Sequence, residues 1–115
     1  MKTKLSNIEL EILAGCVADL AEILSRGTPS GYGHGSERIR LADARDGYVI
    51  CQPGRWLHCD TSDTALRMRV SRAYASLERR GLVERIDLGS GRCTHLAPTP
   101  AGKQLAATLR ASTDG

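Results

Sequence analysis

The sequence contains no phenylalanine, one tryptophan and three tyrosines, so large aromatic side chains cannot build its interior. Leucine, isoleucine, valine and alanine must fill the core instead, which suits small helices that pack closely. A chain of 115 residues corresponds to one domain, and it buries only about two-thirds of the surface of its unfolded chain. We therefore expect a single domain over residues 1–115 with a small core.

Long apolar runs are also missing. None approaches the roughly 20 residues that a membrane-spanning helix needs. The N-terminal sequence MKTKLSNIELE becomes acidic too early for a secretory signal. We therefore expect a cytoplasmic protein that has no membrane partner.

The sequence lacks the CxxC spacing of zinc and redox sites, although it contains four cysteines: Cys16, Cys51, Cys59 and Cys93. His58 with Cys59, and Cys93 with His95, could supply four ligands to a tetrahedral zinc ion. Free thiols are also common as small buried side chains. We expect no metal and no cofactor, and we keep a thiol or metal sensor that uses Cys51, Cys59 and Cys93 as an alternative function.

No spacing of nucleophile, base and orienting residue indicates an enzyme. His34 falls in a glycine-rich stretch, while His58 and His95 fall in segments that we expect to be strands. We interpret each histidine as an ordinary surface or hairpin residue. Trp56 is expected to fill the core under a hairpin rather than to stack on a nucleic-acid base.

Charge is concentrated in one part of the chain. Residues 61–96 hold seven arginines against four acidic residues, whereas the rest of the chain has nine basic and nine acidic residues. The whole net charge of +3 therefore arises in this one segment. A basic segment indicates a nucleic-acid partner, although an arginine-bearing helix face is by default only solvated.

Apolar residues between Leu5 and Leu24 recur at helical spacing, and Gly27 can end the helix. These residues cover about 200° of the helical wheel, whereas one core contact needs a stripe of about 100°. Either the helix is buried deeply in its own domain, or half of the stripe contacts a second subunit. On the second interpretation we expect a homodimer through the Leu5–Leu24 helix.

Residues 27–60 contain half of the twelve glycines, and we expect them to form a loop and hairpin region. SERIRLADAR predicts a short helix with Ser36 as its cap. YVIC and RWLHC flank Gln52-Pro53-Gly54, and a Pro-Gly pair suits a type II turn. We therefore predict a hairpin here, with Gly54 at positive φ.

The segment 63–80 predicts a helix that is capped by Asp63 and stopped by Gly81. Its apolar stripe consists of Leu66, Val70, Ala73, Tyr74 and Leu77. Its arginines lie off this stripe, with Arg69, Arg72 and Arg79 on one flank beside Ser76 and with Arg67 on the other. Arg79 and Arg80 also suit the negative end of the helix dipole.

Strand-like segments follow at Leu82–Leu88 and Arg92–Leu96, with Gly89-Ser90-Gly91 as a turn between them. Thr99 and Pro100 then open a last helix, whose tail we expect to fray from Ala111. Its apolar face consists of Leu105, Ala106 and Leu109. A helix, two strands and a helix in this order are typical of a winged helix-turn-helix. The predicted fold class is therefore mainly α with a small β-hairpin wing, an α+β fold.

Several motifs over about the last 45 residues resemble the recognition helix, wing and final turn of MarR-like winged-helix proteins. These motifs are LERRGLVER (77–85), Gly91-Arg92, Thr94-His95-Leu96 and Thr99-Pro100-Ala101-Gly102. Residues 27–60 show no obvious pattern for the first helix of the turn motif.

The resemblance implies a sequence-specific regulator of transcription that binds double-stranded DNA. It implies that helix 63–80 enters the major groove and that the wing, 82–97, meets the backbone. The residues nearest the bases are then Arg67, Arg69, Ser71 and Arg72, and the candidates for phosphate contacts are Arg85, Arg92 and Thr94. A winged-helix module for protein contacts in a larger assembly is the other alternative.

Overall fold

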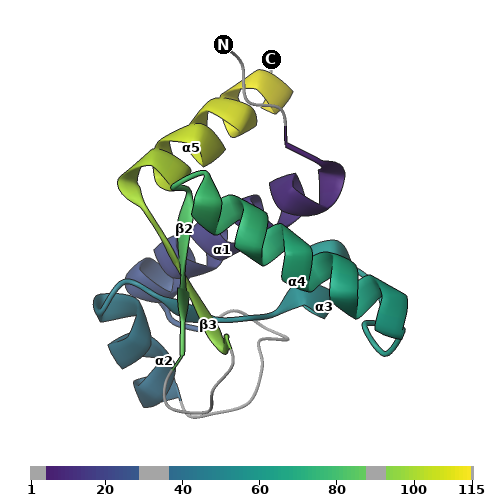
Figure 1. Ribbon diagram of the computed structural model, residues 1–115. Helices are drawn as coiled ribbons and strands as arrows, with labels where there is room; N and C mark the ends of the chain where they lie inside the picture. Colours follow the sequence, from purple (N-terminus) through teal and green to yellow (C-terminus); the bar gives the residue numbers. More distant parts are fainter. Residues whose placement is uncertain (1–4, 29–36, 88–92, 115) are drawn as a thin grey trace.

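The computed structural model describes residues 5–28, 37–87 and 93–114 (Figure 1). The elements in chain order are α1 (Asn7–Arg26), α2 (Glu37–Arg45), β1 (Val49–Ile50), α3 (Pro53–Leu57), α4 (Thr64–Arg79), β2 (Val83–Ile86), β3 (His95–Pro98) and α5 (Pro100–Asp114). Helices dominate, and the three short strands form one antiparallel sheet. The fold is thus mainly helical with a small sheet, as the sequence predicts.

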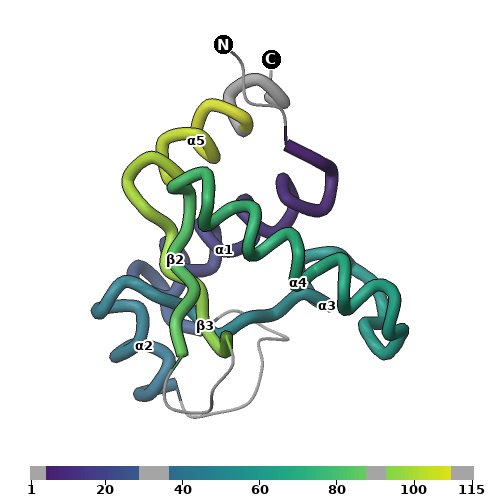
Figure 2. Tube along the Cα trace, in the orientation of Figure 1, coloured from purple at the N-terminus to yellow at the C-terminus, as the bar shows by residue number. Residues whose placement is uncertain are grey.

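Helix α1 is the centre of the molecule. It begins with a capping box, in which the Ser6 hydroxyl accepts from the Glu9 amide and the Glu9 carboxylate accepts from the Ser6 amide, and it stops at Gly27 with φ 102°. All four other helices and the sheet lie around it (Figure 2). Ile12, Leu13 and their apolar neighbours are buried by these elements, while Leu24 stays 51% exposed. Most of the wide apolar stripe of α1 is therefore buried against other elements of the same chain.

The sheet has the strand order β1-β3-β2, so its middle strand comes last in the sequence. Strands β2 and β3 pair antiparallel with Arg85 opposite Leu96, which confirms the predicted hairpin. Strand β2 is shorter than predicted, and β3 lies at His95–Pro98 and so extends two residues beyond its predicted end at Leu96. Strand β1 pairs with the other edge of β3, with Val49 opposite Leu96. The predicted turn 89–91 lies outside the described residues.

The predicted hairpin around Pro53-Gly54 is wrong. Pro53 is the first residue of α3, and Gly54 is not among the glycines with positive φ. The same fixed φ that suits proline to a turn also suits it to the first position of a helix. Trp56 is buried as predicted, but it is in α3 and packs on α1. The described residues of the region 27–60 thus form two helices and a strand instead of a loop and a hairpin.

Helix α5 begins as predicted, because the Thr99 hydroxyl accepts from the Gly102 amide at 3.0 Å and donates to the Gly81 carbonyl at 2.6 Å. A Cβ at Gly102 would lie 2.0 Å from the carbonyl oxygen of Leu82, so this position requires glycine. The helix continues to Asp114, so it includes residues 111–114, from which fraying is expected. Helix α2 also forms as predicted, but its expected cap, Ser36, lies outside the described residues.

Candidate functional site

Helix α4 has one buried face and one exposed face. Val70, Ala73, Tyr74 and Leu77 are buried against the core, as the apolar stripe predicts. Asp63 caps the helix by accepting from the Ala65 amide at 3.2 Å. The exposed face of its first half carries Arg67, Met68, Arg69, Ser71 and Arg72. All four base-contact candidates therefore lie on the surface of one helical segment.

The arginines of this face lie beside two different grooves. Arg69 and Arg72, together with Arg79, line a groove whose other wall is the first turn of α1. Arg67 and Ser71 line a second groove, together with Pro53 of α3 and the two thiols of Cys51 and Cys93. The exposed face of α4 is thus bordered by arginine on both sides.

Within the described part of the chain, neither a hydrogen bond nor an ion pair occupies the guanidinium groups of Arg67, Arg69 and Arg72. A guanidinium group presents five N–H donors in a planar fork that matches paired acceptors on guanine or phosphate. The first half of α4 therefore offers donor groups that an anionic or acceptor-rich partner can use.

Two of the phosphate-contact candidates, Arg85 and Thr94, form hydrogen bonds within the chain, unlike the arginines on the first half of α4. Nε and Nη2 of Arg85 both lie 2.8 Å from Oε1 of Glu78, and the Arg85 amide donates to Oε2. These hydrogen bonds lower the pKa of Glu78. The Thr94 hydroxyl lies 2.7 Å from Nδ1 of His95. Arg85 therefore ties the hairpin to α4, whereas the Thr94 contact lies within the hairpin, and Arg92 lies outside the described residues.

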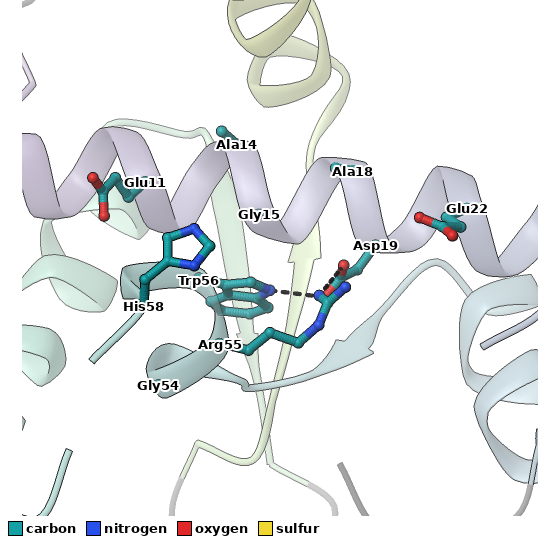
Figure 3. Close-up of a pocket in the computed structure, with 10 residues that line it drawn as sticks. All are labelled: Glu11, Ala14, Gly15, Ala18, Asp19, Glu22, Gly54, Arg55, Trp56 and His58. Atoms are coloured by element: carbon teal, nitrogen blue, oxygen red, sulfur yellow. Dashed lines mark hydrogen bonds and ion pairs between the residues drawn. The ribbon is translucent and has the colours of Figure 1, made fainter. Parts of the chain in front are cut away.

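A polar contact joins α1 to α3 (Figure 3). The carboxylate of Asp19, which is only 3% exposed, accepts a hydrogen bond from Nε1 of Trp56 at 2.8 Å and pairs with Arg55. The Trp56 ring lies against Gly15, where a Cβ would come within 2.4 Å of it. This contact was not predicted from the sequence. Its signal was the presence of Gly15 and Asp19 within the apolar helical pattern of α1.

His95 is not a surface residue. Its ring is buried in β3, where Nε2 lies 3.4 Å from Oδ2 of Asp43, and Nη1 of Arg40 lies 3.2 Å from the same oxygen. The edge of the Tyr48 ring completes the cluster. Burial lowers the pKa of His95, so the neutral imidazole is favoured. This cluster attaches α2 to the sheet, and its residues are far apart in the sequence.

The zinc arrangement considered from the sequence does not assemble. In the parts of the chain that the structure describes, no three histidine, cysteine or acidic side chains are grouped as metal ligands. His58 ends α3 with φ 55°, and Cys59 is exposed beside it. Cys51 and Cys93 do come together, with their sulfur atoms 3.9 Å apart.

Comparison with known proteins adds no further assignment. No family model, curated protein or solved structure matches the chain. The described residues include no helix with the length and apolar content needed to cross a bilayer.

Proposed function

We propose that this chain is a winged helix-turn-helix protein that binds double-stranded DNA through α4 and regulates transcription. The order of α3, α4 and the β2-β3 hairpin supports this proposal, because it is the order of a turn motif followed by a wing. Helix α3 takes the place of the first helix of the turn motif, and residues 58–63 connect it to α4.

The observation that carries the proposal is the set of exposed arginines on the first half of α4, opposite a buried apolar face. The N-terminal part of a recognition helix is the part that reaches base edges in the major groove. Arg67, Arg69 and Arg72 supply forked donors for guanine, and Ser71 supplies a hydroxyl. Arg85, Arg92 and Thr94 meet phosphates, and the ion pair with Glu78 holds Arg85 in position beside α4.

The proposal includes a homodimer, because two recognition helices about 34 Å apart read two half-sites on one face of the duplex. The central part of α1 is covered inside the chain, so the contact falls on its exposed end at Leu24. Sedimentation at micromolar protein should then give twice the chain mass of 12.4 kDa. A clean monomer removes the dimer from the proposal.

The test of DNA binding starts with selection of duplexes from a random pool at low ionic strength. Arg69→Ala and Arg72→Ala should each weaken the selected site by roughly 5- to 150-fold, since a bidentate base contact contributes about 1–3 kcal/mol. The same substitutions should weaken binding to random duplex by a smaller factor. Arg45→Ala, which removes an exposed arginine on α2 at the opposite side of the view in Figure 1, is the matched control for charge.

Arg92→Ala should weaken selected and random duplexes alike and lower the salt slope by about one, as expected of a phosphate contact. Circular dichroism establishes that each variant is folded. A parent protein without salt-sensitive affinity for any duplex would contradict the regulator proposal.

The second candidate function is a module for protein contacts. Met68, which is 52% exposed on the same face of α4, favours it, because exposed methionine is common on adaptable protein-binding surfaces. Met68→Ala should then weaken capture of a partner protein while the arginine variants leave that capture intact. On the DNA-binding proposal the arginine variants have the larger effect.

A further inference from the structure

Two cysteines that are 42 residues apart in the sequence meet beside the sheet. Cys51 follows β1, and Cys93 comes shortly before β3. The backbone amide of Cys51 donates to the Thr94 carbonyl at 3.0 Å, which continues the pairing of the two strands, and the two sulfur atoms are 3.9 Å apart. The pairing of β1 with β3 therefore brings both thiols to one place.

Solvent can reach this pair. Both cysteines are partly exposed, and both line the groove beside Arg67 and Met68 of α4. The other two cysteines differ from them: Cys16 is fully buried in α1, and Cys59 is exposed but forms no such contact with another described cysteine. Only one pair of thiols in the described chain is thus both adjacent and accessible.

The two thiols are chemically unequal. A hydrogen bond with the Cys51 thiol lowers the pKa of Cys93 to about 7, and the Arg85 guanidinium acts in the same direction. The same hydrogen bond and burial raise the pKa of Cys51. Since the thiolate is the form that attacks an oxidant, Cys93 reacts first and Cys51 remains protonated beside it.

We propose that Cys51 and Cys93 are a modification site that forms a reversible disulfide when the protein meets hydrogen peroxide or an organic hydroperoxide. The Cys93 thiolate attacks the terminal peroxide oxygen and the O–O bond breaks. Hydrogen peroxide releases hydroxide, which takes up a proton to become water, and an organic hydroperoxide releases an alkoxide, which takes up a proton to become an alcohol. Cys93 is then a neutral sulfenic acid. The Cys51 sulfur attacks the Cys93 sulfur, the S–O bond breaks, and the departing hydroxide accepts the thiol proton of Cys51 as water.

The geometry suits this second step. A disulfide bond is about 2.05 Å long, so the sulfur atoms must approach by about 2 Å, which rotation about the two Cα–Cβ bonds and a small backbone shift can supply. Loss of the negative charge on Cys93 also removes the hydrogen bond that keeps Cys51 protonated. The product links the segment before α3 to the segment before β3 and closes a loop that contains α3, α4 and β2.

The experiment treats the fully reduced protein with a few equivalents of hydrogen peroxide and then blocks the remaining thiols with N-ethylmaleimide. Trypsin places the four cysteines in four different peptides, and residues 46–55 and 93–103 carry Cys51 and Cys93. We expect a linked 46–55/93–103 peptide, loss of two of the four free thiols, and recovery of both with dithiothreitol. The oxidised protein should also unfold at a Tm several degrees higher, because the cross-link restricts the unfolded chain.

Cys51→Ser should stop the reaction at a Cys93 sulfenic acid that dimedone traps, and Cys93→Ser should leave Cys51 unreacted at the same dose. Cys59→Ser is the matched control and should behave as the parent protein does. Links between other cysteines, or free Cys51 and Cys93 after Cys59 has reacted, overturn the proposal. The peptide analysis requires no DNA, so its outcome is independent of the proposed function.

Discussion

Replacing Gly15 with alanine should destabilise the protein by about 1–3 kcal/mol, although alanine is the better helix former. The new methyl carbon would lie 2.4 Å from the Trp56 ring, whereas ordinary contacts begin at 3.4 Å, so the two groups must separate by an ångström or more. The indole cannot retreat freely, because its Nε1 donates to the buried Asp19 carboxylate. Losing that hydrogen bond would itself cost about 1–3 kcal/mol, which exceeds the helix-propensity gain of about 1 kcal/mol.

The assay is urea unfolding followed by circular dichroism and by the fluorescence of the single tryptophan. Trp56→Ala removes the obstacle, so Gly15→Ala should become neutral or stabilising by up to about 1 kcal/mol in that background, where circular dichroism alone follows unfolding because the single tryptophan is gone. Ala18→Gly, at an exposed position of the same helix, measures the propensity difference alone. If Gly15→Ala stabilises the parent protein by that difference, the packing argument is refuted.

Gly102→Ala should destabilise the protein more than Gly15→Ala does, because its methyl group would meet the Leu82 carbonyl oxygen of the backbone rather than a side chain; chemical denaturation of both variants compares them. A lowered pKa of His95 means that the unfolded chain binds a proton more readily than the folded chain. The stability contributed by the neutral imidazole is complete above the unfolded pKa of about 6.5 and is lost as the pH falls from that value through the lower pKa of the folded chain. Unfolding free energies from about pH 7.5 to about pH 5.5 should therefore fall more steeply for the parent protein than for His95→Gln, and equal slopes would contradict this assignment.

Local signals predicted the elements whose ends are marked in the sequence. Asp63 and Gly81 bound α4, and Thr99 with Pro100 opens α5, because caps act on the nearest backbone groups. The exposed face of α4 followed from its apolar stripe, so the candidate site was also predictable in part. Pro53 was ambiguous, since its φ suits a turn and a helix start alike.

The remaining features depend on contacts between distant segments. Whether residues 53–57 became a helix or a strand was decided by Trp56, Gly15 and Asp19 together, and no local pattern contains all three. The proximity of Cys51 and Cys93 follows from the pairing of β1 with β3, and a strand of two residues gives little sequence signal. The ion pair of Arg85 with Glu78 was not predicted, because the two residues lie in different elements, β2 and α4.

The central position of α1 also governs how the chain acquires its structure. Helix α1 leaves the ribosome before the helices that pack on it, so its apolar residues stay uncovered until α4 and α5 have been synthesised. Such sequence-distant contacts slow folding and favour a single cooperative transition. In hydrogen exchange, the amides around Ile12 and Leu13 should therefore open only with global unfolding, while α2, at the periphery, should exchange through local opening.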